Sequence, residues 1–300
     1  MNCLITGGAG HIGSHLALRL HEEGHDVDII DNLSVGNRDA IKDLENLGWK
    51  GEFTKASIND PQMVSYALQS KKYDVCFHLA GYTVPQDSVK KPVVYYENNL
   101  SPFTQFLSSL IFHGVNRIVL CRTEHNYTPC ETSARTVEQI LYDVCKVTPN
   151  INYSSFRLPE VVGNNIDGKI GDYGFSKKNK LICNCMSASA KNIPQVVVDN
   201  GADLHKLIHV DDVVEELIKS LNDTKNQIHH VNPAIITTAR SIVESCVKVT
   251  AGKYPVIEKK YDQDEVDTVD IKVNKSASIT CLDTITKSIW NWIKRVKKIP

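Results

Sequence analysis

Short, almost continuously apolar runs alternate with amphipathic segments over the first 158 residues of the 300-residue chain. Runs such as 74–79 and 116–121 have the uninterrupted hydrophobicity of strands that are buried on both faces of a parallel sheet. We therefore expect an α/β fold with a doubly wound parallel sheet and helices on both faces. The pattern predicts strands at 2–6, 26–31, 51–55, 74–79, 116–121 and 151–158, and helices that begin near Ile12, Arg38, Pro61, Val93 and Arg135.

The regular alternation stops after Leu158. Residues 159–193 are rich in glycine and asparagine, which is typical of the loops and short helices of an inserted lobe. Residues 208–210 resemble a short strand, and we expect Asp211 to cap the helix that follows. A last helix from about Leu282 has an apolar stripe made by Ile285, Ile289, Trp292, Ile293 and Val296. The chain is thus predicted to have a large domain at 1–158, completed by about 204–233, and a smaller C-terminal α/β lobe at about 159–203 and 234–300.

A glycine-rich turn joins the first strand to the first helix. Gly8, Gly10 and Gly13 have the G-x-G-x-x-G spacing in which one glycine makes the turn, one admits phosphates and one lets helix and strand pack closely. A pyrophosphate would lie at the helix N-terminus, among free N–H groups. Asp31 ends the second strand 24 residues after Gly7, where a carboxylate binds the adenosine ribose and disfavours a 2′-phosphate. The turn therefore predicts a dinucleotide site that takes NAD rather than NADP.

Composition excludes several other classes of protein. A formal net charge of −1 with 42% hydrophobic residues is typical of a globular protein and not of a nucleic-acid binder. Met1 leads directly into a strand and no long uncharged apolar segment occurs, so we expect neither a signal peptide nor a membrane span. Nine cysteines, mostly within apolar runs, indicate reduced thiols and a cytoplasmic location. Cys183-x-Cys185 lacks a second ligand pair, so no metal site is expected.

Further motifs extend over nearly the whole chain. They are Thr6–His15, Gly24–Val27, Asp31–Leu33, His78–Gly81, Ser88–Pro92, Tyr95–Asn99, Val137–Leu141, Ile208–Asp212 and Trp290-x-Trp292. On these residues the chain resembles the extended short-chain dehydrogenase/reductase family of NAD-dependent epimerases and dehydratases, most closely the UDP-glucose 4-epimerases. The resemblance implies a Rossmann-type fold, an NAD cofactor, a nucleotide-sugar substrate that binds in the smaller lobe, and a dimer.

The resemblance also assigns roles to individual positions. It places one group at the pyrophosphate, a second at the adenosine, a third in the cofactor cleft, and Asn99 against the backbone of that cleft. Thr123 matches the catalytic serine or threonine of the family and would also contact the cofactor. The pyrophosphate group consists of Gly7, Gly10, His11, Ile12 and Gly13. The adenosine group consists of Asp31, Asn32, Ser57 and Ile58, and the cleft group consists of Leu79, Ala80 and Gly81.

The proton-transfer residues of the family are missing at their expected positions. A tyrosine and a lysine four residues apart, in which the lysine lowers the pKa of the phenol, would fall on Cys130 and Ala134. About twenty residues usually found before this helix are also absent after Tyr127. A literal Tyr142-x-x-x-Lys146 occurs 12 residues later, about 18 Å along a helix and about 120° around it. We expect that this pair does not replace the missing one.

The substrate side departs from the family pattern as well. Glu160 stands where an asparagine follows the sixth strand, and His205 or Lys206 stands where an arginine would clamp the sugar nucleotide. The leading hypothesis is a pseudoenzyme that binds NAD, with a nucleotide sugar as candidate ligand and a binding or regulatory role. The alternative is an active UDP-sugar 4-epimerase or 4,6-dehydratase with a rearranged base, for which the candidates are Tyr142, Tyr127 and Cys130.

The family dimer packs two helices of each copy into a four-helix bundle. Two interpretations of the corresponding apolar residues stay open: they build such a bundle with a second copy or an active relative, or they only cover the sheet. The residues are Phe106, Leu107, Leu110, Ile111, Ile140 and Val144.

Overall fold

The computed structural model describes residues 1–123, 128–173, 181–191, 195–197, 204–250, 256–258 and 281–297. The chain divides into two compact units. Unit 1 consists of Met1–Leu158 and Val214–Val231, and unit 2 consists of Pro159–Val213 and Asn232–Pro300.

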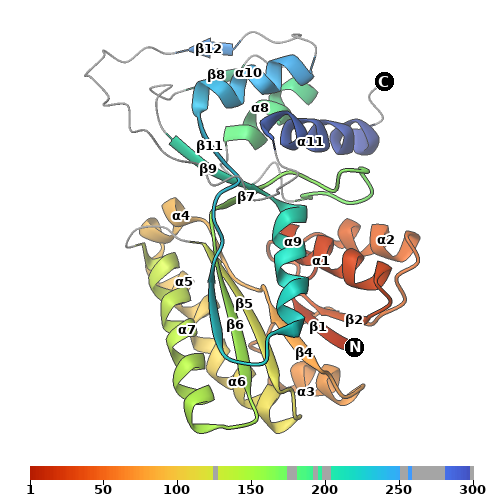
Figure 1. Ribbon diagram of the computed structural model, residues 1–300, viewed down its shortest axis with the longest axis vertical. Coiled ribbons are helices and arrows are strands. Elements are labelled where there is room, and N and C mark those ends of the chain that lie inside the picture. The colour runs from red at the N-terminus through yellow and green to blue at the C-terminus, as the bar shows by residue number, and fades with distance from the viewer. Residues whose placement is uncertain are drawn as a thin grey trace. The chain divides into compact units, whose positions relative to one another are not determined.

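Unit 1 is built on a seven-stranded sheet in which every pairing is parallel. The strand order is β10-β6-β5-β4-β1-β2-β3, so β1 lies where the two halves of the sheet meet. This arrangement confirms the predicted doubly wound, Rossmann-type fold (Figure 1). The strands are β1 (Asn2–Thr6), β2 (Asp26–Ile30), β3 (Phe53–Thr54), β4 (Val75–His78), β5 (Arg117–Thr123), β6 (Asn152–Leu158) and β10 (Gln227–His230).

Helices cover both faces of this sheet (Figure 1). One face carries α1 (His11–Glu22), α2 (Arg38–Asn46) and α9 (Val210–Lys219). The other carries α3 (Pro61–Gln69), α5 (Pro92–Asn99), α6 (Ser101–Phe112) and α7 (Pro129–Val147), with the short α4 (Pro85–Lys90) beside them; η2 (Ser220–Asn222) follows α9.

The apolar residues of α6 belong to the core of unit 1. Phe106, Leu107 and Leu110 are at most 3% exposed and pack with β4, β5 and α3, so they cover the sheet rather than forming a bundle surface. Ile140 and Val144 on α7 pack partly against the same core. The first of the two interpretations is therefore wrong for the three α6 residues, because their helix turns them toward the sheet.

Some element boundaries differ from the predicted ones. The helix predicted near Arg135 begins at Pro129, since Thr128 caps it and proline suits a first helical position. The helix predicted to begin near Val93 forms α5 and α6, and the short α4 precedes it; each of the three has a proline in its first turn. Asp211 lies inside α9 rather than capping it. Val296 is 51% exposed and is not part of the buried stripe.

Unit 2 contains a three-stranded sheet of order β11-β9-β7 and a parallel pair, β12 and β8. Helices α8, α10 and α11 pack around a core that includes Met186, Cys246, Ile289 and Trp292. The elements are β7 (Glu160–Val162), α8 (Leu181–Lys191), β8 (Gln195–Val197), β9 (Leu204–His209), β11 (Ile235–Thr238), α10 (Ala239–Val249), β12 (Val256–Glu258) and α11 (Leu282–Lys297).

All nine cysteines are free thiols, and Cys281 is the exposed one. Among the described helices, none has the length and the apolar character required to span a bilayer.

Candidate cofactor and active site

The glycine turn packs tightly against the end of β4. Gly7 has φ +74°, and a Cβ on it would lie 2.7 Å from the amide nitrogen of Ala80. A Cβ on Gly13 would lie 2.3 Å from the carbonyl oxygen of Gly7. Both positions therefore require glycine, one for its backbone conformation and one for the close approach of α1 to the turn. The turn brings Gly7 and the predicted cleft residue Ala80 into direct proximity.

The N-terminus of α1 has no side-chain cap. Its N-cap is Gly10, which supplies no side-chain hydrogen bond, and His11 and Ile12 begin the helix. The N–H groups of this first turn and the positive end of the helix dipole are the features that bind a pyrophosphate. The predicted residues Gly7, Gly10, His11, Ile12 and Gly13 thus form one continuous turn whose shape fits a dinucleotide.

Asp31 is held at the end of β2 by the backbone. Its carboxylate accepts hydrogen bonds from the N–H of Ala9 at 3.0 Å and of Leu33 at 2.7 Å. Burial raises the pKa of Asp31, and these two hydrogen bonds oppose the rise. Each oxygen accepts one of the two bonds and keeps a further lone pair, so the carboxylate has capacity for ribose hydroxyls.

The other residues predicted at the adenosine follow nearby strands. Asn32 accepts from the N–H of Ser34 at 2.9 Å. Ser57 and Ile58 come after β3, where the Ser57 hydroxyl accepts from the N–H of Asn59 at 3.2 Å and Ile58 is buried. These residues lie at the carboxyl ends of β2 and β3, the edge at which ligands bind in such sheets.

A pocket lies at the carboxyl ends of β4 and β5 and is closed by α7. Asn99 fixes one wall, since it accepts from the N–H of Tyr82 at 2.8 Å and donates to its carbonyl at 2.9 Å. The structure therefore brings the predicted cleft residues together with Cys130 and Ala134, the two positions to which the resemblance assigns the family tyrosine and lysine. The pocket is lined by His78, Leu79, Ala80, Gly81, Tyr82, Thr83, Asn99, Leu120, Cys121, Arg122, Cys130, Ala134, Val137, Glu138 and Ser155.

Cys130 is a hydrogen-bond donor in this pocket. Its thiol donates to the carbonyl oxygen of Tyr82 at 3.3 Å. Burial, and to a smaller degree the charge of Glu131, raise the pKa of Cys130 to about 11. The thiol is consequently protonated near neutral pH and has no basic form to offer. Ala134, one turn further along α7, contributes a methyl group where an ammonium would be required.

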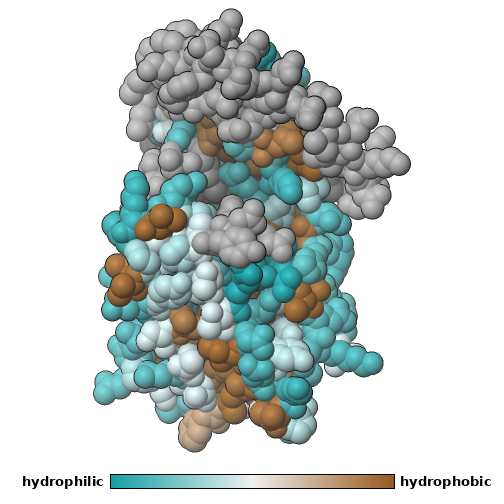
Figure 2. Space-filling model, turned by 90° about the vertical axis from the view of Figure 1, so that its left-hand side faces the viewer, coloured by the Kyte–Doolittle hydropathy of each residue, from teal (hydrophilic) through white to brown (hydrophobic). Residues whose placement is uncertain are grey.

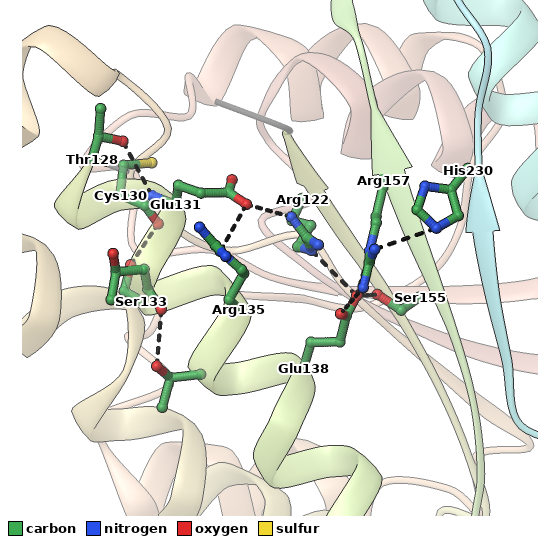
Figure 3. A network of polar contacts seen from close by, with 12 residues as sticks. Arg122, Thr128, Cys130, Glu131, Ser133, Arg135, Glu138, Ser155, Arg157 and His230 are labelled. Carbon is green, nitrogen blue, oxygen red and sulfur yellow. Dashed lines mark hydrogen bonds and ion pairs between the residues drawn. The ribbon is translucent and has the colours of Figure 1, made fainter. Parts of the chain in front are cut away.

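The lining of the pocket includes part of a network of charged side chains (Figure 3). Arg122 on β5 donates to Glu131 at 2.5 Å and to Glu138 at 3.2 Å, both on α7. Glu138 also pairs with Arg157 at 2.7 Å and accepts from the hydroxyl of Ser155. Burial alone would raise the pKa of Glu138, but the bonds from Arg157, Ser155 and Arg122 outweigh it and hold the pKa below its usual range. The network fixes α7 against β5 and β6.

Several predicted site residues are not part of this pocket. Tyr142 is 46% exposed on α7, and Lys146 is exposed one turn later. Thr123 is the last residue of β5, but its side chain lies outside the described residues, as does Tyr127. Glu160 and His205 belong to unit 2, where they face each other across β7 and β9 at 3.8 Å. No cluster of metal-ligating side chains is found among the described residues.

Two pocket residues were missed from the sequence. Arg122 follows the apolar run of β5, and a charged residue at that point is the signal that could have drawn attention to it. Tyr82 directly follows the predicted cleft residue Gly81, and its ring packs edge-on against Tyr95 at 5.7 Å between ring centroids. It is a phenol in the lining of the pocket.

We compared the chain with known protein families, sequences and structures. The model of the "NAD dependent epimerase/dehydratase family" matches residues 3–233. A probable UDP-arabinose 4-epimerase 3 of Oryza sativa subsp. japonica is 26% identical and covers 97% of this chain and 82% of its own length. A UDP-glucose 4-epimerase of Lactobacillus helveticus is 25% identical, with 98% and 97% covered. The crystal structure of a UDP-glucose-4-epimerase from Stenotrophomonas maltophila, with bound NAD and formylated UDP-arabinopyranose, superposes with a TM-score of 0.86 at 20% identity over the full length of both chains.

Proposed function

Because the chain belongs to the NAD-dependent epimerase/dehydratase family and its cofactor is NAD, we propose that it binds NAD and a nucleotide sugar with little or no epimerase activity. When bound, NAD supplies hydride acceptance and return. The N–H groups at the start of α1 hold its pyrophosphate, and Asp31 orients the adenosine ribose. Such a protein acts by binding, as a sensor or as a regulatory partner of an active relative.

The observation that carries the proposal is the content of the pocket at α7. Oxidation of a sugar hydroxyl requires a group that takes its proton while the hydride leaves. Cys130 offers a protonated thiol that is already engaged with Tyr82, and Ala134 offers no charge. A positioned general base contributes roughly 10²–10⁴-fold to a rate. Loss of the base and of its activating cation therefore slows hydride transfer without removing the contacts that hold NAD.

The test separates binding from turnover. Purified protein loaded with NAD is mixed with UDP-glucose or UDP-galactose, and reduced-nicotinamide absorbance and sugar interconversion are followed. We expect NAD retention and sugar-nucleotide binding in calorimetry, with interconversion at least 100-fold slower than for an active epimerase measured in parallel. Turnover at a normal rate would contradict the proposal, and failure to bind NAD would remove its premise.

The alternative, an active enzyme with a rearranged base, gains one specific candidate from the geometry. Tyr82 lines the pocket, whereas Tyr142 is on the exposed surface of α7. Any residual turnover is therefore assigned by comparing Tyr82→Phe, Tyr127→Phe and Tyr142→Phe. If activity is present and disappears only in Tyr82→Phe, the chain is an enzyme that draws its phenol from the β4 side of the pocket.

We extend the proposal to partners and location. Pairing with a second copy or an active relative would use the outward sides of α6 and α7, where Ile111, Phe112 and Val147 are exposed. The face with α5 and α7 is mostly hydrophilic or neutral, with hydrophobic residues in separate patches (Figure 2). Light scattering of the wild type and of Phe112→Lys tests this pairing. The nine free thiols favour a reducing, cytoplasmic environment.

A further inference from the structure

The pocket contains a buried guanidinium with an unused hydrogen-bonding group. The side chain of Arg122 is 5% exposed; its Nη1 donates to Glu131 and its Nε to Glu138. Arg122 makes no other hydrogen bond in the part of the chain that the structure describes, so its Nη2 amino group has no acceptor there. Arg122 also lines the pocket.

Two carboxylates face the guanidinium of Arg122. Glu131 and Glu138 are its two partners, and each carboxylate has a second arginine, Arg135 at 3.4 Å and Arg157 at 2.7 Å (Figure 3). A further anion would have to approach Glu138, which also lines the pocket. A neutral acceptor faces no such repulsion. The site is therefore suited to an uncharged oxygen rather than to a phosphate or a carboxylate.

The position of Arg122 places this donor next to the reacting end of the ligands. It precedes Thr123 at the carboxyl end of β5, the edge at which doubly wound sheets bind their ligands. The opposite wall, Leu79–Gly81, packs against the turn at Gly7. A dinucleotide with its pyrophosphate at that turn would have this pocket within reach of its second ring.

Building on the function proposed above, we propose that Arg122 is a binding residue that donates a hydrogen bond from Nη2 to a neutral carbonyl oxygen of the bound ligand. Two ligands carry one: the nicotinamide carboxamide of NAD and the ketone of an oxidised nucleotide sugar. A guanidinium keeps its protons throughout the physiological range. It thus donates to an acceptor oxygen, of which a carbonyl is one that brings no competing O–H donor, and it cannot take a proton from a hydroxyl.

Two pairs of probes distinguish the sources of the carbonyl. NAD is compared with ADP-ribose, which lacks the nicotinamide. UDP-4-keto-6-deoxyglucose is compared with UDP-6-deoxyglucose on NAD-loaded protein. Each is titrated by calorimetry into the wild type and into Arg122→Lys, which keeps a positive charge but loses the planar donors. Arg135→Lys is the matched control, because Arg135 belongs to the same network and does not line the pocket.

A carboxamide acceptor is indicated if Arg122→Lys weakens NAD about tenfold or more and leaves ADP-ribose unchanged. A sugar ketone is indicated if the wild type prefers the keto nucleotide by about tenfold or more and Arg122→Lys loses this preference. If neither effect occurs, or if Arg135→Lys reproduces it, the inference is overturned. The keto preference of the wild type is measured without any substitution, so the test survives a variant that fails to fold. Wild-type protein that does not bind ADP-ribose would instead refute the proposed function itself.

Discussion

Two helices begin at the carboxyl edge of the same sheet, and their N-termini differ. The first turn of α1 follows Gly10, which supplies no side-chain cap. The first turn of α7 is closed, because Thr128 accepts from the N–H of Glu131 at 3.3 Å and Glu131 binds Arg122. The first end presents backbone groups without a side-chain cap, and the second is held by side chains.

The difference explains why the two halves of the site respond differently to substitution. The phosphate turn depends on the conformation and close packing of glycines, so changing it disturbs the fold as well as the ligand. The proton-transfer pair that the resemblance assigns to Cys130 and Ala134 consists of two side chains that α7 does not need in order to form. Cys130 is 4% exposed and continues the buried side of α7. Chemistry can therefore be lost at α7 while binding at α1 persists.

The largest expected effect comes from adding a side chain at Gly10, the N-cap residue of α1. In Gly10→Val, a branched side chain occupies the space above the turn, and we expect NAD affinity to fall at least 100-fold by steric exclusion. Equilibrium dialysis with NAD measures it. Gly24→Asn is the matched control, since Gly24 has φ +83° with open space around it, and asparagine tolerates that conformation. Unchanged NAD binding in Gly10→Val would place the cofactor elsewhere.

The converse change adds a phenol and an ammonium group near the N-terminus of α7. In Cys130→Tyr with Ala134→Lys, a phenol and an ammonium enter the pocket beside Tyr82 and Glu138. We expect interconversion of UDP-glucose and UDP-galactose to rise about 100-fold or more over the wild type.

Cys130→Phe with Ala134→Lys provides the control for this restoration. It supplies the same ring without the hydroxyl and should remain at the wild-type rate. Equal rates in the two double variants would mean that the missing base is not what limits turnover.

The sequence predicted the N-terminus of α1 better than that of α7. The strand, glycine turn and helix from Asn2 to Glu22 are a local pattern, because the constraint on each glycine arises within a few residues of it. Arg122 could not be assigned a role in this way. Its partners lie 9 and 16 residues further along, and only the packing of α7 on β5 brings them together.

Helical spacing alone could not decide which partner the apolar residues of α6 meet. It identifies Phe106 and Leu110 as one apolar face, but a sheet and a second helix would both satisfy that face. The start of α7 differs from the predicted one although Thr128-Pro129 is a local capping signal, with threonine at the cap and proline at the first helical position.

The titratable residue His78 contacts β1, which leads into the glycine turn, and also lines the pocket beside α7. Its Nδ1 lies 2.8 Å from the hydroxyl of Thr6, and its ring lines the pocket. Burial lowers the pKa of His78 to about 4. Between this value and the usual value of about 6.5, the unfolded chain binds a proton that the folded chain does not, so stability falls as the pH falls.

Urea unfolding at pH 7 and near pH 4.5 tests this linkage. We expect the loss of unfolding free energy between the two conditions to be about 2 kcal/mol smaller in His78→Phe than in the wild type. His209, whose pKa burial also lowers to about 4, remains in both proteins, so the difference isolates His78. An identical loss in both proteins would mean that His78 titrates normally in the folded state.

The smallest effect concerns the cap that closes α7. Thr128→Ala removes one acceptor, and we expect it to cost about 1 kcal/mol of unfolding free energy with no change in NAD affinity. Asp60→Ala is the reference, because Asp60 caps α3 with two bonds, from Gln62 at 3.2 Å and Met63 at 3.1 Å, and should cost more. Urea unfolding ranks the two variants. If Thr128→Ala instead weakened NAD while stability held, the N-terminus of α7 would belong to the ligand, and the contrast between the two helix ends would fail.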